Sequence, residues 1–269
     1  MELWTALTYN MFMPVPFDPR IRNAMNFREL GGQRTLDGRT IRHGVFLRSG
    51  GLHLFQEEEL DVLREYGVTR ILDFREKFSW KRKPDPDIGA SHVAYDGITA
   101  AGGEKLDFTP KGFALTGRAA EEKLAKLKEY YAGMPFGYQA FHAMIDTLRE
   151  GCDCFLFHCS KGKDRTGIAA IVLMYLLGAD EDAIMEEYLL SNEYRRELIR
   201  TIMNEGRNTH PDDPLYLRLM FLREGVEEEM GRGALDRIIT RCGSPENYAR
   251  MEYGMDEKAL EQLRRMYLE

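Results

Sequence analysis

The chain has 269 residues, of which 43% are hydrophobic and 30% charged, a composition typical of a globular protein. Its formal net charge of −7 does not support a nucleic-acid binder, which usually carries a basic face, or a general attraction to anionic membranes. No apolar run approaches the roughly 18 residues of a membrane-spanning helix, so we expect no stable membrane insertion.

The chain begins with a segment rich in turn-forming residues. Residues 1–43 contain three early prolines and the pair Gly31-Gly32, and they show no basic region followed by an apolar one, so we predict no signal peptide. The four cysteines are too few for a disulfide scaffold. Free thiols indicate a reducing compartment, and we therefore predict a cytoplasmic protein.

The next segment alternates between strand and helix patterns. We predict strands over 44–50, 68–74 and 91–97 and a helix over 55–67, which has acidic residues in its first turn and a glycine at its end. Strand, helix and strand in this order predict a βαβ unit and a parallel sheet.

Residues 99–137 differ from their surroundings, because glycines flank a charged helical stretch. We predict a helical lid insertion here. The alternative is a solvated helix that covers nothing.

The second half of the chain is predominantly helical. We predict a helix over 137–151, a buried strand over 152–158 and, from Thr166, a helix that is apolar on most faces and therefore central. Ser244 and Asp256 are predicted helix N-caps, because each precedes a helical pattern. The remaining helical segments are 180–192, 193–206, 214–231, 233–243, 244–254 and 256–269.

We find no repeats and no interdomain linker, so we predict a single domain over residues 1–269. Cys152 and Cys154 occupy alternate positions of a predicted strand and are expected to point the same way, into packing. No second ligand pair suggests a metal site with them. A redox role together with Cys159 is the alternative.

The segment HCSKGKDRTG, residues 158–167, lies between this strand and the central helix. A glycine-containing loop at a helix N-terminus can surround an anion with backbone N–H groups. Such donors, with a nearby arginine, also lower the pKa of a thiol from about 8.5 to about 3.5–7.5, which makes Cys159 a candidate nucleophile. The same loop would hold the oxygens of a phosphoryl group above the sulfur.

Arg165 follows Cys159 by six residues. Its planar guanidinium can donate two hydrogen bonds to phosphoryl oxygens, whereas a lysine supplies charge without that geometry. The other three cysteines have His, Ser or Tyr at the equivalent position. The alternative is a buried structural thiol among solvated cations.

HCSKGKDRTG resembles the phosphate-binding loop of cysteine-dependent protein tyrosine phosphatases. NFRELGG (26–32), FLRSGGLH (46–53), ILDFRE (71–76) and the tail from 243 to 268 narrow the resemblance to the bacterial tyrosine-phosphatase-like family that includes mycobacterial protein tyrosine phosphatase B. The resemblance implies an α/β fold with a central, mainly parallel sheet flanked by helices. It also implies hydrolysis through a phosphocysteine intermediate with no metal and no cofactor.

The resemblance assigns roles to the loop. Cys159 would attack phosphorus, Arg165 would bind the equatorial oxygens, and the Thr166 hydroxyl would help the sulfur leave. A lysine at 163 resembles lipid phosphatases, so phosphoinositides join phosphotyrosine-containing proteins as expected substrates, with dual specificity for phosphoserine or phosphothreonine. The substrate-binding residues are Ser160, Lys161, Gly162, Lys163, Asp164, Arg165 and Thr166.

A carboxylic acid must protonate the leaving oxygen. We favour Asp73, which ends a predicted strand, and give Asp164 a shared or alternative role. The structural alternative for Asp73 is a salt bridge with Arg75 or another arginine. The structural alternative for Asp164 is an orienting contact with Lys163 or Arg165.

Asn26 and Arg48 lie in the matched segments, and we assign them no role beyond holding the loop. The basic run 81–83 is interpreted as a solvated surface run rather than as a rim for phosphorylated substrates.

Three other functions compete with hydrolysis. A non-catalytic phosphate-recognition module would need the loop but not the thiol. An aspartate phosphatase needs D-x-D-x-[TV] after a strand, and DPDIG at 85–89 fails at its last position. A sulfur transferase or arsenate reductase also uses an anion-binding loop, but the flanking segments favour phosphate esters. We therefore predict a phosphomonoester hydrolase.

Overall fold

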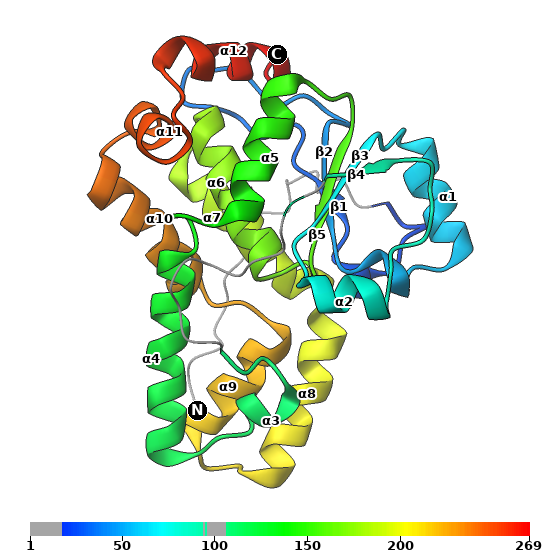
Figure 1. Ribbon diagram of the computed structural model, residues 1–269. Coiled ribbons are helices and arrows are strands. Elements are labelled where there is room, and N and C mark those ends of the chain that lie inside the picture. Colours follow the sequence, from blue (N-terminus) through cyan, green and yellow to red (C-terminus); the bar gives the residue numbers. More distant parts are fainter. Residues whose placement is uncertain (1–17, 94, 96–105) are drawn as a thin grey trace.

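The structure is a computed structural model that describes residues 18–93, 95 and 106–269 (Figure 1). Its strands are β1 (Arg28–Glu29), β2 (Phe46–Ser49), β3 (Arg70–Asp73), β4 (Ser91–His92) and β5 (Phe155–His158). Its helices are α1 (Glu57–Glu65), α2 (Lys77–Arg82), α3 (Pro110–Phe113), α4 (Gly117–Gly133), α5 (Gln139–Glu150), α6 (Arg165–Leu177), α7 (Glu181–Tyr194), α8 (Arg196–Thr209), α9 (Pro214–Glu224), α10 (Glu228–Cys242), α11 (Pro245–Tyr253) and α12 (Glu257–Tyr267), with 3-10 turns at Asn23–Met25 and Leu52–Leu54.

The five strands form one sheet in the order β1-β2-β5-β3-β4. β2, β5, β3 and β4 are parallel, and only β1 at the edge runs antiparallel to its neighbour. The predicted α/β fold with a mainly parallel sheet flanked by helices is confirmed. The predicted β2–α1–β3 unit is parallel as expected, but β5 lies between its two strands, so the strand that leads into the 158–167 segment is central.

Alternation along the strands separates two cores. On β5, Phe155 and Phe157 join the larger core, whereas Leu156 joins the smaller one. On β2 and β3, Leu47 and Ile71 point to the same face as Leu156. Helix α1 covers this face, and α5 and α6 cover the other (Figure 1). Buried on both sides, the strand that precedes the loop is held rigidly in position.

Helix α6 is the centre of the larger core. Every residue from Thr166 to Leu177 is buried, as its pattern predicted. The helix therefore has its N-terminus fixed directly after the loop that follows β5.

The C-terminal region is helical as predicted, and both predicted N-caps are confirmed. The Ser244 side chain accepts a hydrogen bond from the amide of Asn247, and the Asp256 side chain accepts one from the amide of Ala259. The predicted single helix over 214–231 is wrong, because the chain breaks at Gly225 into α9 and α10.

The prediction that Cys152 and Cys154 point the same way is also wrong. Both precede β5, so strand alternation does not extend to them. Cys154 lies in the smaller core and Cys152 packs against the larger one, beside the Tyr267 hydroxyl at 3.7 Å. Burial raises the pKa of both thiols, that of Cys154 to about 12, which keeps them protonated.

The region predicted as a lid is partly outside the described residues, which resume at 106. Its predicted helix is α4, which packs along α10 and touches α9. The predicted strand over 91–97 is seen as β4, and most of its second half also lies outside the described residues. No helix in the described ranges has both the length and the apolar character needed to cross a membrane.

Candidate active site

The 159–164 loop joins β5 to α6 and passes directly over the end of β2. Gly162 has a φ of +67°, and a Cβ atom there would lie 2.5 Å from the carbonyl carbon and oxygen of Ser49. Only glycine fits this position, because a side chain would both strain the backbone and collide with β2. The loop is therefore seated against the sheet.

Carbonyl groups of the loop accept hydrogen bonds from residues that lie outside the loop. The Gly162 oxygen accepts hydrogen bonds from Asn26 Nδ2 at 2.9 Å and from an Arg48 guanidinium nitrogen at 2.7 Å. The Ser160 oxygen accepts one from the amide of Gly51 at 3.2 Å. The amides of the last five loop residues donate to no acceptor in the described part of the chain. Outward carbonyls and unpaired amides are what an anion-binding loop requires.

The Cys159 thiol lies at the base of this loop and is only 1% exposed. Burial by itself raises the pKa of the thiol, and the Asp164 carboxylate acts in the same direction. The Arg165 guanidinium and the hydroxyl and amide of Thr166 outweigh both, so the pKa of Cys159 lies below its ordinary value. Thr166 Oγ1 is buried and has no partner at ordinary hydrogen-bond geometry among the described residues, so it is available to the sulfur.

The Arg165 guanidinium is anchored just beyond the end of β3 by a hydrogen bond of 2.7 Å to the carbonyl oxygen of Phe74. Burial alone lowers its pKa, but the negative charge of Cys159 raises the pKa of Arg165 overall. The sulfur and the guanidinium therefore stabilise each other's charged form.

A buried ionic cluster supports the loop from the β3 side. His158 is fully buried, with Nε2 2.8 Å from Asp85 and Nδ1 3.4 Å from the carbonyl oxygen of Cys159. Burial lowers the pKa of His158, but Asp73 and Asp85 raise it above its usual value. Arg75 completes the cluster, 2.7 Å from Asp73 and 2.8 Å from Asp85.

This cluster also contains the one group of metal-ligand atoms found among the described residues, from Asp73, Asp85 and His158. These atoms lie within 4.8 Å of one another. The Arg75 guanidinium pairs with both carboxylates and already supplies the positive charge. The cluster therefore does not fit a metal ion.

For Asp73 the geometry favours the structural alternative. One carboxylate oxygen accepts hydrogen bonds from the Arg75 amide at 2.8 Å and Nε at 2.9 Å, and the other accepts one from Nε at 2.7 Å. Both oxygens of the Asp73 carboxylate are therefore occupied by Arg75, which makes the side chain a structural partner of the guanidinium.

Asp164 lies at the start of α6 and is bound from two directions. Lys163 Nζ donates to it at 2.6 Å, and the Tyr131 hydroxyl of α4 donates to the same oxygen. Burial raises the pKa of Asp164, but Lys163 and Tyr131 lower it below its usual value. The predicted orienting contact with Lys163 is thus present, and the residue also links α4 to the loop.

The two loop lysines reach the C-terminal end of α9. Lys163 Nζ donates to the Leu222 oxygen at 2.9 Å, and Lys161 Nζ donates to the Arg223 oxygen at 2.6 Å. A helix end leaves carbonyl groups unpaired and attracts cations. Because α9 ends before Gly225, its last carbonyl groups are available to accept hydrogen bonds from these lysines. Ser160, between them and the thiol, is exposed.

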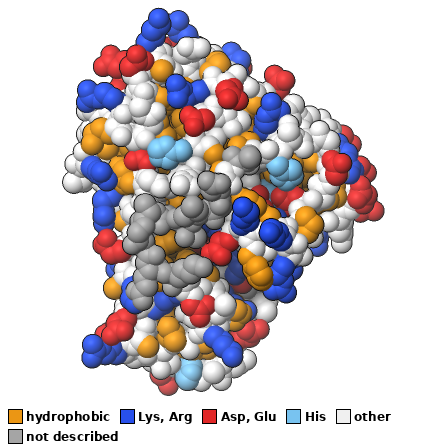
Figure 2. Space-filling view, in the orientation of Figure 1, with side chains coloured by type: hydrophobic (Ala, Val, Ile, Leu, Met, Phe, Trp, Pro, Cys, Tyr) orange, Lys and Arg blue, Asp and Glu red, His pale blue; other side chains and the backbone are white. Residues whose placement is uncertain are grey.

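Helix α2 follows β3 and carries a basic surface. Lys77, Lys81, Arg82 and Lys83 are exposed, and none of them forms an ion pair with a described residue. Phe78 is 66% exposed, with the Arg82 guanidinium 5.4 Å from its ring centroid. Figure 2 shows Lys and Arg side chains gathered here beside hydrophobic atoms. The run 81–83 is exposed, which agrees both with a solvated surface run and with a basic rim for phosphorylated substrates.

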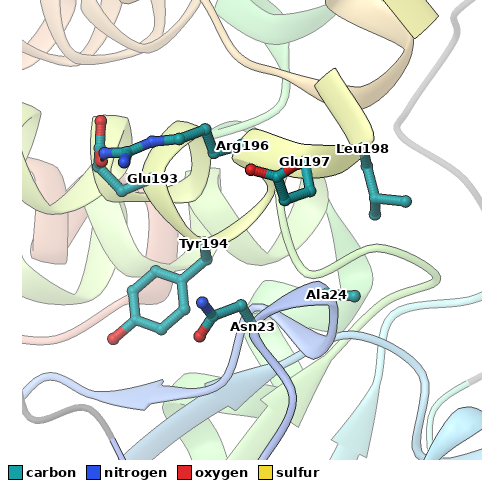
Figure 3. Close-up of a pocket in the computed structure, with 7 residues that line it drawn as sticks. All are labelled: Asn23, Ala24, Glu193, Tyr194, Arg196, Glu197 and Leu198. Atoms are coloured by element: carbon teal, nitrogen blue, oxygen red, sulfur yellow. Dashed lines mark hydrogen bonds and ion pairs between the residues drawn. The ribbon is translucent and has the colours of Figure 1, made fainter. Parts of the chain in front are cut away.

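A small pocket lies elsewhere, between the turn at Asn23–Met25 and the junction of α7 and α8 (Figure 3). Asn23, Tyr194 and Leu198 contribute to its wall, and no residue of the loop does. It is therefore separate from the candidate active site.

Sequence reasoning missed Asp85, Tyr131 and Glu187, each of which contacts the site or its supports. Glu187 is 2% exposed although three other acidic residues of α7, Glu181, Asp182 and Glu186, precede it. Its helical spacing from buried apolar residues such as Ile184 was the available signal.

Comparisons with known proteins agree with this geometry. A family model described as "Tyrosine phosphatase family" matches residues 19–269. A provisionally named tyrosine-protein phosphatase of Cupriavidus necator is 29% identical over 247 residues, which cover 90% of this chain and 85% of that protein. A tyrosine-protein phosphatase of Nostoc commune is 29% identical over 56% of this chain and 49% of its own length. The triple specificity protein phosphatase PtpB of Mycobacterium tuberculosis is 24% identical over 63% of this chain and 67% of its own length.

Proposed function

Because the chain belongs to the tyrosine phosphatase family, we propose that it hydrolyses phosphotyrosine in proteins through attack of Cys159 on phosphorus. One observation carries the proposal. The Cys159 sulfur, with its pKa lowered by Arg165 and Thr166, lies in a loop whose amides are unpaired among the described residues. A pure phosphate-recognition module would need the amides and the arginine but not an activated thiol.

The reaction has two steps. In the first, the Cys159 thiolate forms a bond to phosphorus while the bond to the tyrosyl oxygen breaks, and that oxygen takes a proton from a carboxylic acid. In the second, water attacks phosphorus and gives a proton to the carboxylate left by the first step, the Cys159–phosphorus bond breaks and inorganic phosphate leaves. Arg165 and the loop amides bind the phosphoryl oxygens in both steps, and the Thr166 hydroxyl donates to the departing sulfur.

Turnover of p-nitrophenyl phosphate tests this function. We expect the purified protein to hydrolyse it at an undiminished rate with a metal chelator present, because no step assigns a role to a metal. A phosphotyrosine peptide should be hydrolysed under the same conditions. Loss of turnover on chelation, restored by a divalent cation, would contradict the mechanism.

We assign proton donation to Asp164 rather than Asp73. Asp164 lies in the loop with its side chain 18% exposed, whereas both Asp73 oxygens are bound by Arg75. Asp164 is ionised in the structure, since its pKa is lowered. A dianionic phosphate bound beside it opposes that shift and raises its pKa toward the range of a proton donor.

The two aspartates are therefore expected to respond differently to amidation. Asp164→Asn should slow hydrolysis of aryl phosphates by about 10²-fold and flatten the basic limb of the pH profile. Asp73→Asn should instead lower the melting temperature, because it removes one partner of a buried ion pair. Full pH–rate profiles and thermal unfolding of both variants check this. A flattened basic limb in the Asp73 variant alone would reverse the assignment.

Phosphoinositide hydrolysis is the second candidate. The exposed cations of α2, which follows the Phe74 carbonyl that binds Arg165, favour substrates with further negative charge near the scissile phosphate. The relative from Mycobacterium tuberculosis is named a triple specificity phosphatase, and the same breadth is proposed here. Rates on phosphotyrosine, phosphoserine and phosphothreonine peptides and on phosphoinositides, measured with one sample, decide among these substrates.

A further inference from the structure

We propose that Arg28, Arg48 and Glu187 form a buried charge cluster beneath the 159–164 loop whose one excess positive charge stabilises the Cys159 thiolate. Within it, Glu187 positions the two arginines. This role deepens the proposed function, because it concerns the same nucleophile, and it goes beyond merely holding the loop in place.

The cluster lies in the protein interior. Arg28 is 1% exposed, Arg48 0% and Glu187 2%. One carboxylate oxygen of Glu187 is 2.6 Å from Arg28 Nε, and the other is 2.6 Å from a terminal nitrogen of Arg48. Two guanidinium groups thus share a single carboxylate, which leaves one positive charge uncompensated by these three residues.

Both arginines are connected to the loop by hydrogen bonds, Arg48 directly and Arg28 through Asn26. Arg48 donates to the Gly162 oxygen at 2.7 Å. Arg28 donates to Asn26 Oδ1 at 2.6 Å, and Asn26 in turn donates to the same Gly162 oxygen at 2.9 Å. Two donors on one carbonyl group fix its orientation outward, away from the anion-binding face of the loop.

Burial keeps the cluster away from the solvent that would screen its charge. Helix α7 covers it, with Ser191 Oγ accepting from Arg28 at 3.2 Å and the Tyr194 ring centroid 5.2 Å from the Arg28 guanidinium. Tyr194 and Asn23 lie side by side in the wall of the pocket in Figure 3, and Arg28 is not among the residues that line this pocket. Arg48 Nε is buried with no acceptor among the described residues.

An uncompensated buried cation is unfavourable unless an anion lies close to it. Burial and repulsion from Arg28 lower the pKa of Arg48 to about 10, while Glu187 and Cys159 act in the opposite direction. Arg48 stays protonated at neutral pH, and the thiolate is an anion that attracts it. Arg165 acts on the sulfur from α6 and Arg48 from β2.

Lys163 and His158 also lie near the sulfur, but each of them faces a carboxylate, Asp164 and Asp85 respectively. Asp164 and the surrounding phenols do not provide the positive charge. Asp164 raises the pKa of Cys159. Burial raises the pKa of the surrounding phenols, so they are neutral. These phenols are Tyr95, Tyr130 and Tyr138 near the sulfur and Tyr188 and Tyr194 near the cluster.

Charge-altering variants test the proposal, because they predict shifts of opposite sign. Arg48→Met removes the excess charge and should raise the pKa of Cys159 by about one unit, a tenfold smaller thiolate fraction at low pH. Arg28→Met should raise it too while leaving the Arg48–Gly162 contact in place. Glu187→Gln adds excess charge and should lower the pKa. Arg48→Lys keeps the charge and should leave the pKa near its wild-type value.

The measurement is the pH dependence of iodoacetamide alkylation at Cys159, located by mass spectrometry because three other cysteines are present. Arg264→Met is the matched control, since it removes an ion pair with Glu246 at the opposite end of α6 and should leave the pKa unchanged. Thermal unfolding establishes which variants are folded. If Glu187→Gln does not fold, Arg28→Met and Arg48→Lys still separate charge from packing.

Shifts of the same sign in the Arg48→Met and Glu187→Gln variants, or no shift in folded Arg48→Met and Arg28→Met, would overturn the proposal. Alkylation needs no substrate, so its outcome is independent of whether the protein hydrolyses phosphotyrosine. Normal shifts with no phosphatase activity would refute the proposed function and leave the charge cluster standing.

Discussion

Replacing Cys159 with serine should reduce the turnover of p-nitrophenyl phosphate by about 10⁴-fold or more. A serine hydroxyl stays protonated at neutral pH, whereas the structure lowers the pKa of the Cys159 thiol through Arg165 and Thr166. The substitution removes the nucleophile while keeping its size, so the loop and its amides should retain their arrangement.

The variant should still bind oxyanions such as vanadate or tungstate, because Arg165 and the loop amides remain. Calorimetry measures this binding, and steady-state kinetics with wild-type protein purified in parallel measures turnover. Cys154→Ser is the matched control, since that thiol is buried in the smaller core and has a raised pKa. Appreciable hydrolysis by the Cys159 variant would refute a phosphocysteine mechanism.

Local sequence patterns predicted which strands and helices form, but not which of them lie side by side in the folded protein. The strand and helix patterns over 44–74 and the central helix from Thr166 appear where the sequence indicated them. The position of β5 between β2 and β3 depends on pairing across about 80 to 110 residues, which no local pattern encodes. The break at Gly225 depends on close neighbours such as Phe221 and Asn192.

In the candidate site, too, local spacing was predictable from the sequence and contacts between distant segments were not. The spacing of Cys159 and Arg165 indicated their shared chemistry, because a short loop between a strand and a helix N-terminus can direct both side chains to one bound anion. Asp73 was favoured as the acid because the end of a strand faces the site. The structure contains the alternative contact, a salt bridge between Asp73 and Arg75. It adds the approach of Asp85 to Arg75 from another segment, which no local pattern indicates.

Buried charge is a recurring feature beneath the loop. His158, with Asp73, Arg75 and Asp85, supports it from β3, and the Arg28–Glu187–Arg48 cluster supports it from β2. Such groups are costly to bury unless they are paired. Their concentration around one thiol is consistent with pKa control as their common effect.

Arg165→Lys provides the second large effect. Lysine retains one positive charge but cannot donate two coplanar hydrogen bonds to phosphoryl oxygens. Its single ammonium group also cannot keep the contact with the Phe74 carbonyl while it binds phosphate. We expect kcat/KM to fall by about 10³-fold, with most of the loss in kcat, because those bonds strengthen as charge develops in the transition state.

Arg165→Met separates geometry from charge. It should raise the pKa of Cys159, since Arg165 is the largest influence that lowers it, whereas Arg165→Lys should leave that pKa much closer to the wild-type value. The pH dependence of Cys159 alkylation measures both, and thermal unfolding confirms that the variants are folded. Equal pKa values in the two variants would mean that Arg165 binds phosphate without activating the sulfur, and thiolate formation would then rest on the loop amides, Thr166 and the buried cluster beneath them.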